Sequence, residues 1–163
     1  MSERVFLGLG SNLSSNLGEP ASNIQIAIEH LKSKDVLKIQ GTSSLYVSPP
    51  MGPQDQPDFV NAVLELNTSL IPDELLALCK SIEDLMVREP TERWGPRVID
   101  IDILLYGDKI IQSKNLNIPH LGIAQRSFVL YPLADLNKDL QVPGVGSLTQ
   151  LIDQLGEPEI RRL

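Results

Sequence analysis

The chain is organised around the segment Arg93-Trp94-Gly95-Pro96-Arg97-Val98-Ile99-Asp100-Ile101-Asp102-Ile103-Leu104-Leu105-Tyr106-Gly107. The branched aliphatic residues from 98 to 106 are typical of a β-strand, and the dipeptide Gly107-Asp108 predicts the turn that ends it. Because side chains alternate along a strand, Asp100 and Asp102 are predicted to lie on one face, about 6–7 Å apart. The opposite face is predicted to be apolar and to consist of Ile99, Ile101, Ile103 and Leu105.

Two carboxylates this close repel each other as anions, and aspartate is a poor strand former. A divalent cation would offset that cost, and paired carboxylates suit magnesium, which also keeps positions for substrate phosphates. A solvated or ion-paired strand edge is the alternative interpretation. Arg93 and Arg97 stand beside the pair, and guanidinium groups next to metal-binding carboxylates are typical of phosphoryl-transfer sites.

Length and composition predict one domain, residues 1–163, of ordinary globular character. The chain has 163 residues, of which 42% are hydrophobic and 21% charged. It has no apolar run long enough to span a bilayer and no signal-peptide pattern, so no membrane association and a cytoplasmic location are expected. The single Cys79 excludes an internal disulfide and is predicted to be a buried apolar residue.

The formal net charge of −7 argues against a nucleic-acid partner, which would need a basic surface. Binding a polyphosphate would then require a local concentration of positive charge. The middle third of the chain supplies one, since these basic residues flank the aspartate pair: Arg88, Arg93, Arg97, His120 and Arg126.

Hydrophobic periodicity predicts the order strand, helix, strand, strand, helix, strand. The strands are predicted at 5–9, 36–46 (broken by Gly41), 59–67 and 98–106, and the helices at 21–34 and 72–87. This order predicts an α+β fold with a ferredoxin-like β-α-β-β-α-β core and an antiparallel sheet. Residues 109–111 are predicted to form an extra β-hairpin arm, and 128–136 and 148–155 short C-terminal helices.

Two smaller patterns carry alternative interpretations. Gly8-x-Gly10 lies at the end of the first strand, but no third glycine opens a helix, so it does not fit a dinucleotide-binding motif. Phe59 and Asn61 share a strand face, where one could stack on a heterocycle and the other read its edge. From these residues alone, a core phenylalanine with a turn asparagine is the simpler interpretation.

Four motifs carry a family resemblance over nearly the whole chain. They are Leu9-Gly10-Ser11-Asn12, the segment from Ser48-Pro49-Pro50-Met51 to Phe59-Val60-Asn61-Ala62, the central Arg93-Trp94-Gly95-Pro96-Arg97 with its Asp-x-Asp, and Pro119-His120 with Arg126-Ser127-Phe128. In these motifs the chain resembles the 6-hydroxymethyl-7,8-dihydropterin pyrophosphokinases of folate biosynthesis.

The resemblance implies transfer of the β,γ-pyrophosphoryl group of ATP to the hydroxymethyl group of the pterin, leaving AMP. It implies two Mg²⁺ ions at Asp100 and Asp102, with Asp102 the nearest candidate proton acceptor. The implied catalytic residues are Asp100, Asp102, Arg88, Arg97, His120 and Arg126. The implied pterin-binding residues are Ser48, Pro49, Met51, Phe59, Asn61, Trp94 and Phe128. The implied ATP-binding residues are Glu83, Arg88, Arg97, Ile103, His120 and Arg126.

The chain departs from the family pattern just before the central segment. Family members usually carry Gly-Arg-x-Arg there, whereas this chain has Met86-Val87-Arg88-Glu89-Pro90-Thr91 and is a residue shorter. Arg88 can stand for either family arginine, and Pro90 is predicted to stiffen the loop that closes over the substrates. Altered closing kinetics are therefore expected, rather than lost activity.

Two alternatives belong to other functional classes. A non-catalytic ferredoxin-like binding module would need several thiols for a metal or a basic aromatic sheet face for RNA, whereas the sequence has one cysteine and a net charge of −7. A metal-dependent phosphohydrolase would use the same aspartates without a stacking pocket. The resemblance further implies a monomer with a possible functional link to dihydropteroate synthase.

Overall fold

A computed structural model describes residues 2–13, 18–50, 52, 55–86, 98–156 and 159–163. The strands of the main sheet are β1 (Glu3–Ser11), β2 (Leu37–Thr42), β3 (Tyr46–Ser48), β4 (Phe59–Thr68), β5 (Asp100–Tyr106) and β10 (Arg161–Arg162). The helices are α1 (Pro20–Lys32), α2 (Pro72–Met86), α3 (Ser127–Leu136) and α4 (Leu148–Leu155), with a 3₁₀ helix at Ile123–Gln125. Two small hairpins pair β6 (Ile111–Gln112) with β7 (Asn117–Ile118) and β8 (Gln141–Val142) with β9 (Gly146–Ser147).

The main sheet has the strand order β10-β3-β4-β1-β5, and β2 also pairs with β4. Every pairing is antiparallel. This arrangement confirms the predicted β-α-β-β-α-β core, because β5 returns beside β1 after the second helix. A hairpin arm is present as predicted, but of residues 109–111 only Ile111 lies in a strand, β6, which pairs with β7 and not with the main sheet.

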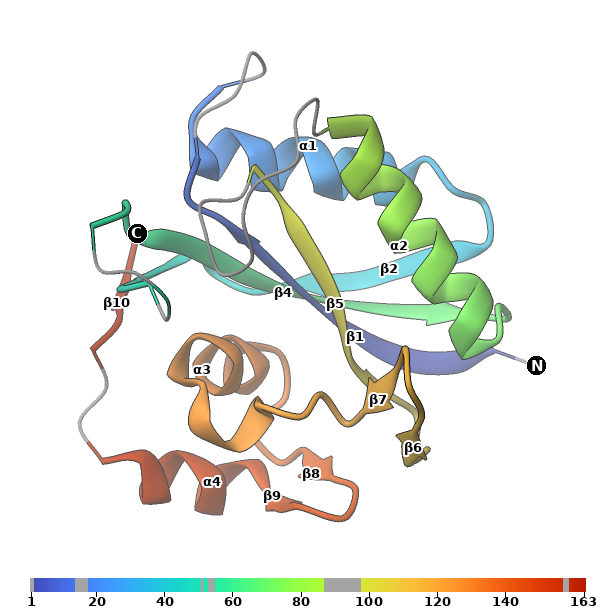
Figure 1. The fold of residues 1–163 in the computed structure, drawn as a ribbon. Coiled ribbons are helices and arrows are strands. Elements are labelled where there is room, and N and C mark those ends of the chain that lie inside the picture. The colour runs from blue at the N-terminus through green and yellow to red at the C-terminus, as the bar shows by residue number, and fades with distance from the viewer. Residues whose placement is uncertain (1, 14–17, 51, 53–54, 87–97, 157–158) are drawn as a thin grey trace.

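Helices cover the sheet on both faces (Figure 1). α1 and α2 lie on one face and bury the larger core, while α3 and α4 lie on the other with a second core. The two helices of the predicted β-α-β-β-α-β unit therefore share one face, as expected. The second layer leaves part of the opposite face open, and the candidate site lies there.

A β-bulge interrupts the alternation of β5. Phe6 and Leu7 are neighbours on β1 but pair with residues two apart on β5, so Leu104 is the extra residue. As a result, Leu104 and Leu105 both pack in the core beneath α3. The prediction that Leu105 shares the apolar face of the three isoleucines is therefore wrong, because a bulge places consecutive side chains on one face.

The helical periodicity of residues 72–87 predicts a buried stripe of Leu75, Leu78, Ile82 and Leu85, and the buried face of α2 differs from it. Leu75 and Ile82 are buried as expected, but Cys79 and Met86 complete the stripe, and Leu85 is 68% exposed. The burial predicted for Cys79 is confirmed, and burial raises the pKa of its thiol to about 12. The thiol therefore stays protonated and acts as a small apolar side chain.

The break predicted at Gly41 lies a few residues later. Gly41 stands at a register irregularity between β2 and β4, and residues 43–45 separate β2 from β3. In that gap the backbone of Ser43 donates a hydrogen bond to the carbonyl of Val63, and its hydroxyl accepts one from the amide of Val63. These bonds hold the gap between β2 and β3 against β4, and β3 then continues along the edge of β4 that β2 also pairs with.

Candidate active site

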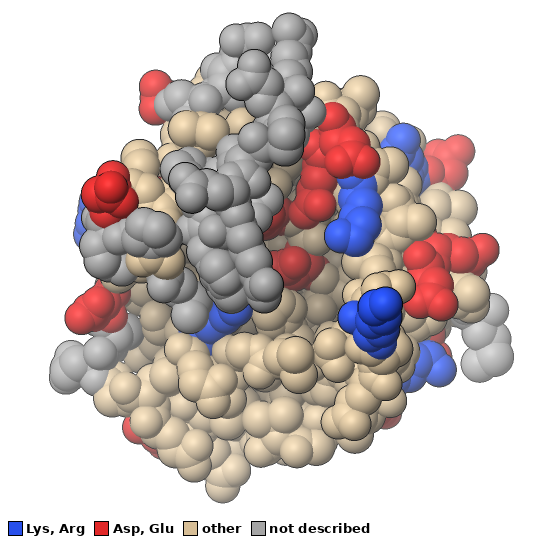
Figure 2. All heavy atoms as spheres, in the orientation of Figure 1, with Lys and Arg blue, Asp and Glu red and all other residues tan. Residues whose placement is uncertain are grey.

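A cavity of about 870 Å³ opens on the face of the sheet that α3 partly covers. This volume is in the range of a ligand pocket. Figure 2 shows acidic side chains within the hollow on this face, with basic side chains nearby. The cavity is lined by these predicted site residues: Ser48, Pro49, Phe59, Asn61, Asp100, Asp102, His120, Arg126 and Phe128.

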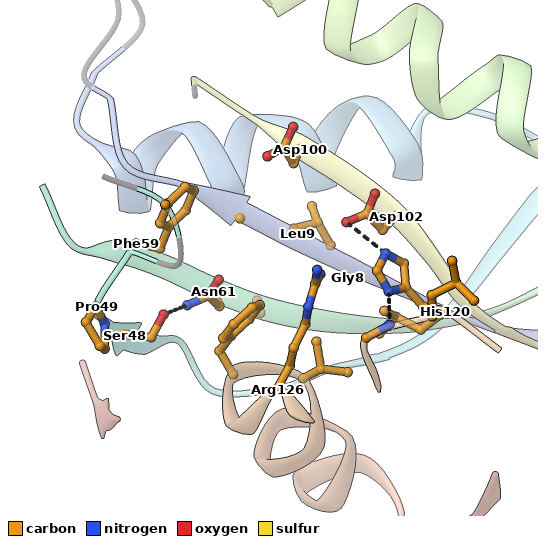
Figure 3. A pocket seen from close by; sticks show the side chains of 18 of the residues that line it. Gly8, Leu9, Ser48, Pro49, Phe59, Asn61, Asp100, Asp102, His120 and Arg126 are labelled. Carbon is orange, nitrogen blue, oxygen red and sulfur yellow. Dashed lines mark hydrogen bonds and ion pairs between the residues drawn. The ribbon is translucent and has the colours of Figure 1, made fainter. Parts of the chain in front are cut away.

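Asp100 and Asp102 project from β5 toward the cavity (Figure 3). Each faces a glycine of β1 across the strand pair, with Asp102 opposite Gly8 and Asp100 opposite Gly10. A Cβ at Gly8 would come within 3.2 Å of the Leu104 side chain. The two glycines therefore make a floor without side chains beside the carboxylates, which leaves room for ligands.

His120 is held beside Asp102 by three neighbours. Its backbone amide donates to the carbonyl of Leu104 (3.1 Å), and its Nδ1 accepts from the amide of Gly122 (3.2 Å). Its Nε2 lies 4.0 Å from Oδ2 of Asp102. Burial lowers the pKa of His120, Asp102 opposes this, and Arg126 adds to the lowering. The neutral ring with its proton on Nε2 therefore presents a donor to the cavity.

Arg126 is the N-cap residue of α3, and its side chain points into the cavity (Figure 3). Its guanidinium lies over the ring of Phe128, 5.7 Å from the centroid. Nε is buried and has no hydrogen-bond partner within the part of the chain that the structure describes. A buried donor without a partner is costly, so an acceptor from a ligand is expected at this position.

Gly122 makes room for that arginine. A Cβ built on Gly122 would lie 2.5 Å from Nε of Arg126 and 3.0 Å from its Cζ. Its backbone has φ −90° and ψ 8°, which other residues also adopt, so the glycine is needed for space. Gly122 therefore determines where the guanidinium of Arg126 lies.

The opposite wall of the cavity comes from β3 and β4. The side-chain amide of Asn61 donates to Oγ of Ser48 (2.7 Å), and both residues are buried. Ser48 pairs across the strands with Phe59. Pro49 completes this wall and is labelled with the others in Figure 3. The strand register therefore places an aromatic ring and a carboxamide side by side.

Asn12 ties the proline-rich segment to the end of β1. Its side-chain amide donates to Oε1 of Gln56 (2.8 Å) and to the carbonyl of Pro57 (2.9 Å). These bonds fix the segment that leads directly into Phe59. The asparagine is 1% exposed, so its hydrogen bonds are shielded from water.

Two predicted ATP-binding residues lie outside the cavity lining. Glu83 of α2 accepts the amide hydrogen of Ile101 (2.6 Å) at the free edge of β5. Burial raises the pKa of Glu83 to about 7, with Asp100 and Asp102 adding to the effect and the bond from Ile101 opposing it. The side chain of Ile103 packs in the core beneath α1 and α2, so any contact with ATP would come from its backbone.

Four other predicted site residues, Met51, Arg88, Trp94 and Arg97, lie outside the described residues. Other contributors to the cavity were not predicted from the sequence. Gly8 belonged there only to an incomplete nucleotide motif, Gly10 to that motif and to Leu9-Gly10-Ser11-Asn12, and Gly122 to no motif at all. Lys80, on α2, lines the cavity although nothing in its helical pattern indicated a site.

Comparisons with known proteins place the chain in one family. Residues 6–138 match the family model described as 7,8-dihydro-6-hydroxymethylpterin-pyrophosphokinase (HPPK). A Pseudomonas aeruginosa protein named 2-amino-4-hydroxy-6-hydroxymethyldihydropteridine pyrophosphokinase is 42% identical over 163 residues, covering 100% of this chain and 98% of that protein. The Haemophilus influenzae protein of the same name is 40% identical over 159 residues, covering 98% of this chain and 97% of that one.

Solved structures show the same fold within longer chains. The crystal structure of wild-type Plasmodium falciparum HPPK-DHPS matches with a TM-score of 0.75 at 18% identity, covering 99% of this chain. This chain spans 48% of that one, about half of its length. At this identity the match supports the fold, and the family follows from the sequence comparisons.

Proposed function

Because the chain belongs to the 7,8-dihydro-6-hydroxymethylpterin-pyrophosphokinase family, we propose that the cavity beside β5 and α3 is where its two substrates react. The protein is a diphosphotransferase of folate biosynthesis. It moves the β,γ-pyrophosphoryl group of ATP to the hydroxymethyl group of 6-hydroxymethyl-7,8-dihydropterin, and AMP leaves. The proposed roles of the cavity residues divide among metal ions, phosphates and the pterin.

Asp100 and Asp102 are proposed to hold two Mg²⁺ ions. The donor set fits this ion, because two oxygen ligands on one strand face adjoin a floor of glycines. Among the described residues, no three His, Cys, Asp or Glu side chains form a closed metal cluster. An open pair suits magnesium, which takes its other ligands from water and phosphate oxygens. When bound there, the ions would supply positive charge that neutralises the phosphates.

Arg126 and His120 are proposed to bind the phosphates of ATP. Arg126 lines the cavity, its buried Nε has no hydrogen-bond partner among the described residues, and phosphate is the acceptor that guanidinium suits best. The neutral Nε2–H of His120 adds a second donor next to Asp102. Both donors would stabilise the charge that develops as AMP leaves. Arg88 and Arg97 are proposed to complete the set.

Phe59 and Phe128 are proposed to hold the flat pterin ring between them. Asn61 is proposed to read its hydrogen-bonding edge, because the bond to Ser48 uses one amide hydrogen and leaves the other hydrogen and the carbonyl oxygen. Pro49 and Ser48 would close the same side. Met51 and Trp94 are proposed to contact the ring as well.

The pterin hydroxyl oxygen forms a bond to the β-phosphorus. The bond from that phosphorus to the oxygen shared with the α-phosphate breaks, and its electron pair leaves with AMP. The hydroxyl proton passes to the carboxylate of Asp102, whose side chain is 50% exposed and therefore open to a ligand. Chain residues thus act by holding both substrates in line and by accepting one proton.

One observation carries the residue assignment: the aspartate pair, Arg126, whose Nε has no hydrogen-bond partner in the described part of the chain, and the Asn61–Ser48 pair line one cavity. The test mixes the protein with ATP, Mg²⁺ and the hydroxymethyl pterin and follows nucleotide products by chromatography. AMP that forms only when the pterin is present supports the proposal. ADP or free phosphate would support the phosphohydrolase instead, and no product would support a binding module.

The remaining expectations concern partners and location. A functional link to dihydropteroate synthase is supported by the Plasmodium falciparum structures, which are named HPPK-DHPS. A monomeric state and a cytoplasmic location stay predictions. In the described part of the chain, no helix is both long and apolar enough to cross a bilayer.

A further inference from the structure

One row of paired residues crosses the main sheet from edge to edge. Arg162 of β10 pairs with Tyr46 of β3, and Tyr46 pairs with Asn61 of β4. Asn61 pairs with Gly10 of β1, which pairs in turn with Asp100 of β5. Directly paired residues share a face of a sheet, so the row lies on the face of the cavity. β10 is therefore connected to the candidate active site through a row of directly paired residues.

Three side chains join the far end of this row to α3. The hydroxyl of Tyr46 lies 2.9 Å from each carboxylate oxygen of Asp135. Arg162 donates from Nη2 to Asp135 Oδ1 (2.8 Å) and from Nε to the Tyr46 hydroxyl (3.1 Å). We refer to Tyr46, Asp135 and Arg162 as the β10 clip. β10 is the edge strand of the main sheet, next to β3, and Figure 1 shows it at that edge.

The β10 clip joins β3 and α3, which carry opposite walls of the part of the cavity proposed to bind the pterin. Asp135 belongs to α3, which begins with the Arg126 cap and Phe128. Tyr46 belongs to β3, which ends at Ser48. Asp135 lies seven positions after Phe128 along α3, a rise of about 10 Å. A shift of β3 against α3 at the clip would therefore change the separation of the walls.

A contribution to the free energy of folding alone does not explain the β10 clip. Arg162 has a side chain that is 65% exposed, and exposed ion pairs add little to the free energy of folding. Its geometry is nevertheless specific, since the guanidinium also lies over the Tyr46 ring, 5.7 Å from the centroid. Burial raises the pKa of Tyr46, so its hydroxyl keeps its proton. That hydroxyl can then donate to Asp135 while accepting from Arg162.

We propose that Arg162 is a positioning residue for the pterin, which acts through Tyr46 and Asp135 by holding β3 and α3 at the separation that the ring requires. The inference rests on the proposed pterin side of the cavity. It assigns to β10 a role in the affinity for one substrate, because β3, the strand that the β10 clip holds, carries Ser48 of the pterin side and no residue assigned to ATP.

Arg162→Ala in the full chain tests this role, and Arg161→Ala is the matched control. Arg161 is the neighbouring exposed residue of β10 and pairs with Val47, so its side chain points to the other face. We expect Arg162→Ala to raise the KM for the pterin by roughly 3- to 10-fold, with the KM for ATP and kcat within about twofold of wild type. Arg161→Ala should leave all three unchanged, and Arg162→Lys should restore part of the loss.

Combining Arg162→Ala with Asp135→Ala should raise the pterin KM no further than the larger single effect, because both remove one unit. Hydrogen exchange at residues 59–62 gives a readout that needs no turnover, and it should quicken in Arg162→Ala but not in Arg161→Ala. If the wild type is active and Arg162→Ala has the same pterin KM, the inference is overturned while the proposed reaction is still supported. Equal rises in both KM values, or equal effects of the two arginines, would also overturn it.

Discussion

Gly122→Ala is expected to separate activity from stability. The added Cβ would lie 2.5 Å from Nε of Arg126, whereas ordinary contacts begin near 3.4 Å, so the guanidinium must move by about 0.9 Å. The arginine side chain is flexible, so it can move without disturbing the core. The displaced guanidinium of Arg126 would no longer hold Nε, which has no partner among the described residues, at the position proposed for phosphate binding.

The size of the effect follows from one charge-assisted hydrogen bond. Such a bond contributes about 1.5–3 kcal/mol, so its loss lowers kcat/KM for ATP by about 10- to 150-fold. The free energy of unfolding should stay the same or increase, because alanine can adopt the φ of −90° at this position. Replacing glycine also lowers the entropy of the unfolded chain, which stabilises the fold by about 0.4–1 kcal/mol. The assay is AMP formation at saturating pterin, with a urea unfolding curve for each variant.

Two controls make the result interpretable. Gly41→Ala adds a Cβ that would meet Leu136 at 3.3 Å, outside the cavity lining, and should leave kcat/KM unchanged. The double variant of Gly122→Ala with Arg126→Ala should be no slower than Arg126→Ala alone. If Gly122→Ala keeps kcat/KM within about twofold of wild type, the reasoning about Arg126 is wrong.

Three further substitutions test other parts of the site. Asp102→Ala should lower turnover at least about 100-fold without lowering the urea midpoint, since it removes one of two repelling charges; a large loss of stability would contradict this. Asn61→Ala should raise the pterin KM and lower the free energy of unfolding by about 1–3 kcal/mol, because the buried Ser48 hydroxyl loses its donor; unchanged pterin binding would refute its assignment. The pKa of Glu83 is raised to about 7, so the folded state keeps this proton up to about pH 7, whereas the unfolded state releases it near pH 4.5. The contribution of this proton to the free energy of unfolding is therefore present at low pH and is lost as pH rises through 7. Urea unfolding without Mg²⁺ at pH 5 and pH 8 should therefore show Glu83→Gln gaining on wild type at the higher pH, and a difference that does not vary with pH would count against the raised pKa.

Local patterns were sufficient to predict the core of the fold. Periodicity alone gave the strand and helix order, because each element buries one face and its sequence repeats accordingly. The shared face of Asp100 and Asp102 was likewise predictable, since it depends on alternation within one strand. The β-bulge at Leu104 was not, because it arises from the pairing of β5 with β1. The stripe on α2 shifted toward Cys79 for a similar reason: neighbouring elements determine which side of a helix is covered.

The parts of the site that escaped prediction depend on contacts distant in sequence or on an absent side chain. Tyr46 and Asp135 are 89 positions apart, and the two residues of β10 are too few to show any period. Gly122 acts through the room it leaves for Arg126, which becomes visible only when the loop and the helix cap are placed together. Motifs therefore indicated the residues proposed to carry the chemistry more readily than those proposed to position them.

The isoleucines of β5 and of the residue just before it, on the face away from the cavity, have a consequence for the aspartate pair. Ile99, Ile101 and Ile103 are at most 3% exposed, and burying a side chain of this kind contributes about 1.5–3 kcal/mol each. Two carboxylates about 6.5 Å apart repel by about 2.5 kcal/mol at an effective dielectric constant of 20. The isoleucine burial exceeds this repulsion, so the strand cannot relax to separate the charges. The hydrophobic core thus keeps an electrostatically unfavourable pair preorganised, and a cation that binds there recovers that free energy as affinity.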